Sequence, residues 1–171
     1  MNPESTNSFT AQDIPNAPGT WWEFECGPQV SYYQDGLELH REVYKQEADA
    51  LSMQETFTVH DTIIVVKDTC YYKLTKDAFS FKVDGQWKEL LRFPVNESLN
   101  WTTFDGDRLV VESTMESVTL PIGNFNNCIK VVSQKDYKAY YYAYGLGMIL
   151  VEDLKNPGSY LLRLSASSQF L

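Results

Sequence analysis

Apolar and polar residues alternate along several short segments of the chain. Between Leu37 and Val43 the odd positions are mostly apolar, and glutamate and histidine lie between them. The segment Leu51–Val59 repeats the pattern, with Ser, Gln and Thr at intervening positions. Because successive side chains of a strand point to opposite faces, this period of two predicts β-strands with one buried and one solvated face.

Tight turns are the second clear signal. Three Asp-Gly pairs separate strand-like segments, and they are Asp35-Gly36, Asp84-Gly85 and Asp105-Gly106. A two-residue hairpin loop requires a positive φ at one or both central residues, and Asp followed by Gly adopts it at little steric cost. Each pair therefore predicts a turn between adjacent antiparallel strands.

Strand-like segments continue to the end of the chain, and they are Cys70–Leu74, Ala78–Val83, Gln86–Phe93, Leu99–Phe104, Leu109–Ser113, Ser117–Leu120, Cys128–Ser133, Lys138–Tyr144, Met148–Glu152 and Tyr160–Ser165. Ten or more short strands predict an all-β protein, built as a curved antiparallel sheet, half-barrel or incomplete barrel. A parallel α/β fold is excluded because the pattern offers no crossover helices. The stretch Arg41–Ser52 contains good helix formers, so it forms either a turn between strands or one short helix.

The chain of 171 residues suits a single domain with one core. Residues 1–18 are rich in Ser, Asn, Thr and Pro, and we expect a flexible tether there, followed by one β domain over residues 19–171. These first residues show neither the basic start nor the apolar segment of a secretory signal. No apolar stretch approaches the roughly 20 residues of a membrane-spanning helix, so no membrane span is expected.

The charge balance limits the classes of partner. Fourteen Lys and Arg residues against 23 Asp and Glu give a net charge of −9, which would repel a phosphate backbone. We therefore expect no nucleic-acid partner, and solubility is the ordinary consequence of this charge. Three cysteines, Cys26, Cys70 and Cys128, form no closely spaced pair, so unpaired thiols are expected.

No motif for catalysis or metal binding is present. His40 and His60 lack partners at metal-ligand spacing, and the segment from Asp105 to Asp107 begins like a calcium loop without completing one. Glu23 and Glu25 would lie on one face of a strand, roughly 7 Å apart, within the range of paired glycosidase carboxylates. Solvated charges are the simpler interpretation, so we expect neither an enzyme nor a metal or cofactor site.

We interpret two further motifs first as structural turns. In the segment Pro121–Phe125, Pro121 ends a strand and Gly123 permits a positive φ, while Gly145 and Gly147 suit a bend or bulge after Tyr140–Tyr144. Their order and spacing resemble a group of bacterial exported or lipoprotein-type β domains. That resemblance implies a curved sheet related to lipoprotein-carrier half-barrels, and a cell-envelope or secreted setting.

Aromatic residues supply the candidate binding site. Period two places Tyr140, Tyr142 and Tyr144 on one face of a strand and Tyr141 on the other. With Trp22, Tyr72, Trp87 and Trp101, they form either core or the lining of a groove. The sequence thus favours a non-enzymatic binding protein that holds a lipid-like molecule or an envelope protein on an aromatic-rich sheet. The alternatives are a carbohydrate-active enzyme or sugar-binding module, and a purely structural surface module.

Overall fold

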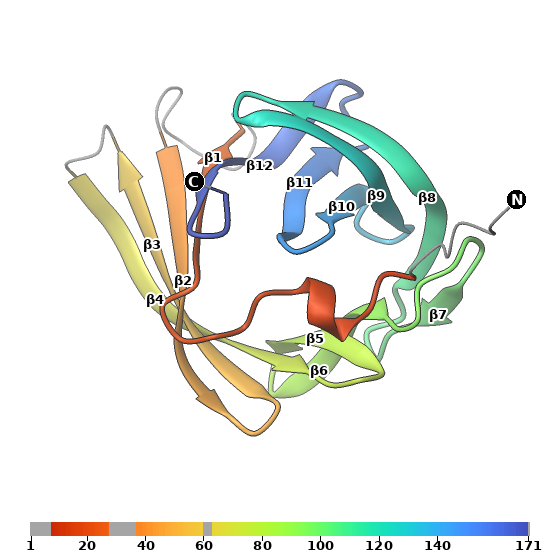
Figure 1. The fold of residues 1–171 in the computed structure, drawn as a ribbon, viewed down its shortest axis with the longest axis horizontal. Helices are drawn as coiled ribbons and strands as arrows, with labels where there is room; N and C mark the ends of the chain where they lie inside the picture. The colour runs from red at the N-terminus through yellow and green to blue at the C-terminus, as the bar shows by residue number, and fades with distance from the viewer. Residues whose placement is uncertain (1–7, 28–36, 60–62, 171) are drawn as a thin grey trace, which may run out of the picture.

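The computed structural model describes residues 8–27, 37–59 and 63–170 (Figure 1). One 3₁₀ turn, η1 (Ala11–Asp13), precedes twelve strands. The strands are β1 (Trp21–Cys26), β2 (Leu37–Glu47), β3 (Ala50–Val59), β4 (Ile63–Leu74), β5 (Ala78–Val83), β6 (Gln86–Arg92), β7 (Asn100–Thr102), β8 (Arg108–Leu120), β9 (Gly123–Ser133), β10 (Lys138–Ala143), β11 (Gly147–Asp153) and β12 (Ser159–Ser167).

All twelve strands belong to one antiparallel sheet, in the order β6-β5-β4-β3-β2-β1-β12-β11-β10-β9-β8-β7. The sheet therefore consists of two meanders, β1–β6 and β7–β12, joined where β1 pairs with β12. This open sheet confirms the predicted all-β fold, and η1 is the only helical turn among the described residues.

The sheet curls until its two edge strands face each other. Figure 1 shows the strands arranged around the interior of the molecule, with β6 and β7 at the free edges. Register shifts occur in several pairs, for example between Val43 and Lys45 and between Tyr141 and Tyr142, and such bulges increase the local twist and bend of a strand. Side chains, rather than a backbone ladder, bridge the edges: the Trp101 indole on β7 donates to the Glu89 carbonyl on β6 at 2.9 Å.

A buried ion cluster lies at the seam, the place where the edge strands β6 and β7 face each other. The Lys88 ammonium on β6 lies 3.1 Å from Asp105, 3.1 Å from Asp107 and 3.4 Å from Asp136. Asp107 is fully buried, and its carboxylate also accepts the Ser133 hydroxyl at 2.7 Å and the Lys135 amide at 3.1 Å. The resemblance of this loop to a calcium site thus has another explanation, because the carboxylates of Asp105 and Asp107 face a lysine.

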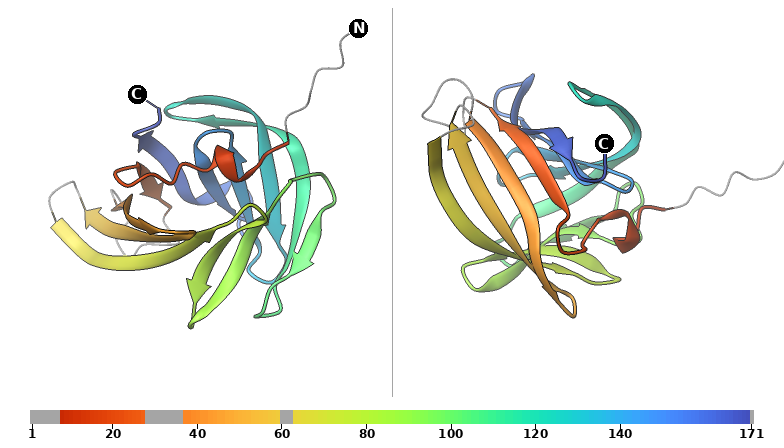
Figure 2. Two further views of the ribbon diagram at one scale, coloured as in Figure 1. Left: turned by 60° about the horizontal axis from the view of Figure 1, so that its bottom comes forward. Right: turned by 60° about the vertical axis from the view of Figure 1, so that its left-hand side comes forward.

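The described residues before β1, 8–20, run along the interior of the curled sheet (Figure 2). Of the expected tether, residues 8–18 are described, and Phe9 and Ile14 are buried there. Phe9 packs edge-on against Tyr144 at 5.0 Å and lies 6.4 Å from Phe93 and from Tyr142, measured between ring centroids. Its carbonyl accepts the Val95 amide at 3.2 Å. Burial of these side chains outweighs the polar composition of the segment.

Two of the three predicted Asp-Gly turns lie in described residues, and both are confirmed. Asp84 and Gly85 join β5 to β6 with φ of 50° and 77°, and Asp105 and Gly106 lie in the short loop between β7 and β8. Asp35 and Gly36 lie outside the described residues. The stretch Arg41–Ser52 forms no helix: β2 and β3 continue through it and reverse at 48–49. The three cysteines are unpaired, as expected.

The two glycine motifs form hairpin ends. Pro121 and Ile122 connect β8 to β9, and a side chain at Gly123 would meet the Phe170 ring at 3.4 Å. Gly145 lies in the turn between β10 and β11, with the Leu146 amide donating to the Ala143 carbonyl at 3.1 Å. The glycines therefore form a turn and not the predicted bulge; the register shift of this hairpin lies within the ladder, between Tyr141 and Tyr142.

Gly145→Val is expected to lower the free energy of unfolding by about 1–3 kcal/mol, because Gly145 has a φ of 73° that a β-branched residue resists. No atom lies within 4 Å of a Cβ built there, so crowding adds nothing. Urea denaturation measures the effect, and Gly145→Asn serves as the control because asparagine tolerates this conformation. Equal midpoints for wild type and Gly145→Val would contradict the structural interpretation of this glycine.

Candidate functional site

The curled sheet encloses a cavity of about 350 Å³ between its walls. Residues of the N-terminal segment, of β1–β6 and of β10–β12 contribute to its lining. The lining residues are Ile14, Trp22, Phe24, Leu39, Arg41, Met53, Glu55, Phe57, Tyr72, Phe79, Phe81, Leu90, Lys138, Tyr140, Tyr142, Gly147, Met148, Val151, Leu161 and Leu162. Both meanders therefore contribute to one site, which exists only when β1 pairs with β12.

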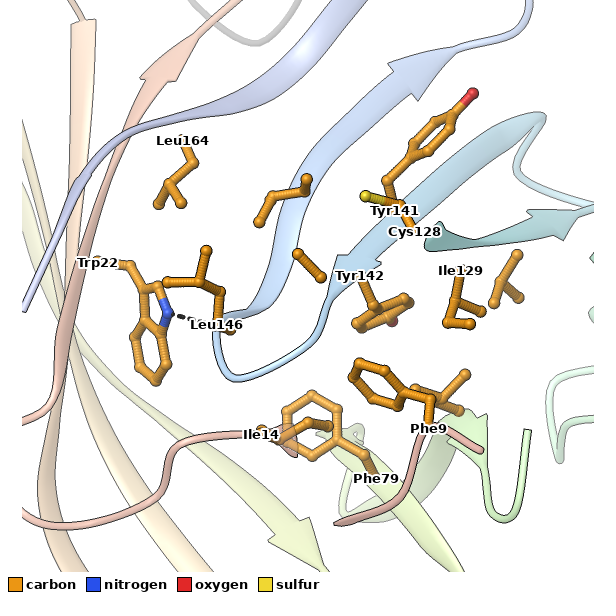
Figure 3. Close-up of a cluster of buried hydrophobic side chains, with 14 of the residues drawn as sticks. Phe9, Ile14, Trp22, Phe79, Cys128, Ile129, Tyr141, Tyr142, Leu146 and Leu164 are labelled. Atoms are coloured by element: carbon orange, nitrogen blue, oxygen red, sulfur yellow. Dashed lines mark hydrogen bonds between the residues drawn. The ribbon is translucent and has the colours of Figure 1, made fainter. Parts of the chain in front are cut away.

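Most of this lining is apolar, and it divides into an inner and an outer part. Ile14, Phe24 and Met53 are buried, whereas Phe57, Phe81 and Leu162 are half-buried. Figure 3 shows four of the lining side chains, Ile14, Trp22, Phe79 and Tyr142. The Trp22 indole donates to the Leu146 carbonyl at 2.8 Å. That bond satisfies the one polar atom of the tryptophan side chain, so Trp22 presents only its apolar ring surface to the cavity.

A charged pair interrupts the apolar wall. Arg41 on β2 and Glu55 on β3 are directly opposite in the ladder, and Nε of Arg41 donates to Glu55 at 2.8 Å. The side chains are 14% and 13% exposed, so the pair is largely removed from solvent. The guanidinium carbon lies 5.5 Å from the ring centroids of both Phe24 and Tyr72, an arrangement that favours a cation.

Two tyrosine hydroxyls on opposite walls differ in their partners. The Tyr72 hydroxyl donates to Glu55 at 3.4 Å, while the Tyr142 hydroxyl is the only buried side-chain N or O atom in the described part of the chain without a hydrogen-bond partner. Burial raises the pKa of both phenols, and it raises that of Tyr140 to about 12. All three tyrosines are therefore neutral hydrogen-bonding groups at physiological pH.

The structure brings four of the seven predicted site residues together, because Trp22, Tyr72, Tyr140 and Tyr142 line the cavity. Trp101 is buried at the seam between β6 and β7. Tyr144 lies beyond the end of β10, 40% exposed, where it packs against Phe9. Figure 3 shows Tyr142 directed toward Phe9 and Tyr141 directed away from it, as the period of two predicts.

Trp87 lies in a different place, along an outer groove formed by the β4–β6 region. The groove also contains Glu89, Arg92 and Asn96. The ammonium groups of Lys73 and Lys82 lie 6.0 and 5.6 Å from the ring centroid of Trp87. These cations occupy the ring surface on which a sugar would stack, so the groove gives the sugar-binding alternative little support.

Sequence reasoning missed Arg41 and Glu55. One signal for Arg41 was present in the sequence. Arg41 alternates with Leu39 and Val43 along one strand, so its charge lies on the apolar face. A charge there is costly unless a partner faces it, and the cross-strand register provides Glu55. The candidate carboxylates have other partners: Glu23 lies 3.4 Å from Nδ1 of His40, and Glu25 forms an ion pair with Arg163.

Metal binding and membrane crossing receive no support from the described residues. Within residues 8–27, 37–59 and 63–170, no three His, Cys, Asp or Glu side chains gather in a way that would hold a metal ion. The described residues also contain no helix long and apolar enough to cross a membrane.

No protein-family model matches the sequence, and no curated protein matches it. Solved structures with a similar fold include a protein inferred to be exported, with a YmcC-like fold, from Bacteroides fragilis; it is 14% identical, with a TM-score of 0.60, over 94% of this chain and 99% of that chain. Another is inferred to be a lipoprotein, from Parabacteroides distasonis; it is 13% identical, with a TM-score of 0.59 and the same coverage. At these identities the likeness shows a shared fold, which this chain has in common with one protein inferred to be exported and another inferred to be a lipoprotein.

Proposed function

We propose that the protein is a non-enzymatic binding protein of the cell envelope or the exterior, which holds an apolar, lipid-like ligand in its interior cavity. The observation that carries this proposal is the cavity itself, about 350 Å³ in volume and lined mainly by apolar side chains. Small-molecule sites are concave, mostly apolar and equipped with a few placed polar groups. Arg41, Glu55, Tyr72 and Tyr142 are such groups here.

The proposed setting rests on the two structural neighbours. One is described as exported and the other as a lipoprotein, and both are bacterial proteins matched over nearly the full length of this chain. The Pro121–Phe125 and Tyr141–Gly147 motifs, which resemble exported and lipoprotein-type domains, agree with that setting.

A binding role fits the titratable groups better than an enzymatic one. Catalytic sites usually contain an acid, base or nucleophile that is free to react with substrate. In this cavity Glu55 is engaged by Arg41 and Tyr72. The thiol of Cys70 is not among the lining residues, and burial and Glu55 raise its pKa to about 12. The remaining polar groups are neutral phenols and Lys138, which suit recognition rather than proton transfer.

A hydrocarbon probe tests whether the cavity takes up apolar molecules. We expect diphenylhexatriene, which fluoresces strongly only in apolar surroundings, to bind the wild-type protein. Met148→Trp places a larger side chain in the cavity, so its Kd for the probe should rise at least tenfold. Fluorescence titration measures both values.

Met115→Trp is the matched control, because Met115 is 73% exposed on β8, outside the cavity lining. It should bind the probe as wild type does. Absence of binding to wild type, or equal loss in the two variants, would reject the cavity as the ligand site.

A further inference from the structure

We infer that the cavity's ligand is an amphiphile with an uncharged hydrogen-bonding group, such as an alcohol, ester or amide, which meets the Tyr142 hydroxyl. This inference rests on the proposed function, since it specifies the chemistry of the molecule held in that cavity. It is carried by three observations: an unpartnered buried hydroxyl, a charge pair that is already balanced, and the size of the apolar space.

The Tyr142 hydroxyl requires a partner that the described residues do not supply. Tyr142 is 1% exposed and lines the cavity, and its oxygen has no hydrogen bond to any described residue. Buried polar groups in native proteins are nearly always hydrogen-bonded, and an unsatisfied one is costly. A molecule inside the cavity therefore has to provide the acceptor or donor.

The charges around the cavity favour an uncharged partner at that position. Arg41 and Glu55 neutralise each other across the β2–β3 ladder, and the Tyr72 hydroxyl donates a hydrogen bond to the same carboxylate. Tyr142 lies within electrostatic reach of Tyr72 and Arg41. A carboxylate added at Tyr142 would leave one buried negative charge in excess, which an apolar interior penalises heavily.

Lys138 is the one other charged side chain of the lining, and it lies far from Tyr142. They are four positions apart along β10, a distance of roughly 13 Å in an extended strand. Lys138 is half-buried, so it stands at the outer part of the cavity. An anionic head group would be drawn to Lys138 and would leave the Tyr142 hydroxyl against the apolar end of the ligand.

The volume limits the size of the ligand. At about 350 Å³ the cavity lies at the lower end of the range of about 300–1,000 Å³ that is typical of small-molecule sites. The apolar lining, which includes Phe57, Phe81 and Leu162, suits a hydrocarbon tail. A small amphiphile with one hydrocarbon chain and one polar end fits this size and this lining.

The test compares 1-decanol with decanoate at pH 7.5, by displacement of diphenylhexatriene from wild type, Tyr142→Phe and Tyr141→Phe. We expect decanol to displace the probe from wild type at a lower concentration than decanoate. Tyr142→Phe should weaken decanol about fivefold, the factor for one neutral hydrogen bond, and leave the probe's own Kd unchanged. Tyr141→Phe is the control, because the Tyr141 hydroxyl donates to Glu152 on the other face of β10.

Each outcome bears on a different claim. Equal decanol affinity in wild type and Tyr142→Phe would overturn the inference, while probe binding would leave the proposed function standing. Tighter binding of decanoate, lost in Lys138→Gln, would also overturn it and place an anionic head group at the outer end. Failure of wild type to bind the hydrocarbon probe would reject the proposed function itself.

Discussion

Lys88→Met is expected to lower the free energy of unfolding by about 3–5 kcal/mol, because it leaves the fully buried carboxylate of Asp107 without its cation. The substitution also removes the contacts of the ammonium to Asp105 and Asp136, which connect β6 to the far edge of the sheet. Urea denaturation measures the loss. Lys76→Met is the control: Lys76 lies exposed in the turn between β4 and β5, where a change within about 0.5 kcal/mol is expected.

The cost of Lys88→Met should diminish in acid. A hydrogen bond from Thr103 and the charge of Lys88 lower the pKa of Asp105 from 3.8 to about 2. A carboxylate whose pKa falls on folding contributes stability above its unfolded value, and that contribution disappears as the pH falls through the folded value. The gap between wild type and Lys88→Met should therefore narrow between about pH 4 and pH 2. A constant gap over this interval would show that the interaction between Lys88 and Asp105 adds nothing to stability, since the Thr103 hydrogen bond is present in both proteins.

Local signals determined which parts of this fold were predictable. Alternation identified strands such as β2 and β3, and Asp84-Gly85 identified the turn between β5 and β6, because both patterns act over a few residues. Leu109–Ser113 and Ser117–Leu120 were expected as two strands, yet they form the single strand β8. Register shifts between Val111 and Val118 explain the break in its pattern, since a bulge changes which residues face inward.

Long-range features left no comparable signal. Lys88 contacts Asp107 only because the sheet curls through twelve strands. No sequence pattern near either residue predicts this contact. Phe9 and Ile14 are separated by mostly polar residues, so composition favoured a tether although both side chains are buried in the core. The tyrosines of β10 were assigned to the correct faces of the strand. The wall of the cavity that contains Arg41 and Glu55 was not predicted, because its position opposite β10 depends on tertiary structure.

The paired charges in the cavity give the second large effect that we expect. Arg41→Met should lower the free energy of unfolding by about 3–5 kcal/mol, because Glu55, 13% exposed, would be left buried without a cation. The double variant Arg41→Met, Glu55→Leu removes both charges together. Replacing a buried ion pair by apolar residues of similar volume is often neutral or stabilising, so the double variant should regain most of the loss. Urea denaturation of the four proteins in this cycle measures the coupling.

This cycle also separates the role of the pair in stability from its role in the site. If the cavity is apolar enough to make an unpaired charge costly, Glu55→Leu alone should also be strongly destabilising, because Arg41 would then lack its carboxylate. Diphenylhexatriene should still bind the double variant, since the apolar lining remains and two charges have become apolar surface. Losses below about 1 kcal/mol for both single variants would mean that solvent in the cavity stabilises each charge alone. The cavity would then contain solvent, and we would no longer expect it to bind an uncharged amphiphile more tightly than an anionic ligand.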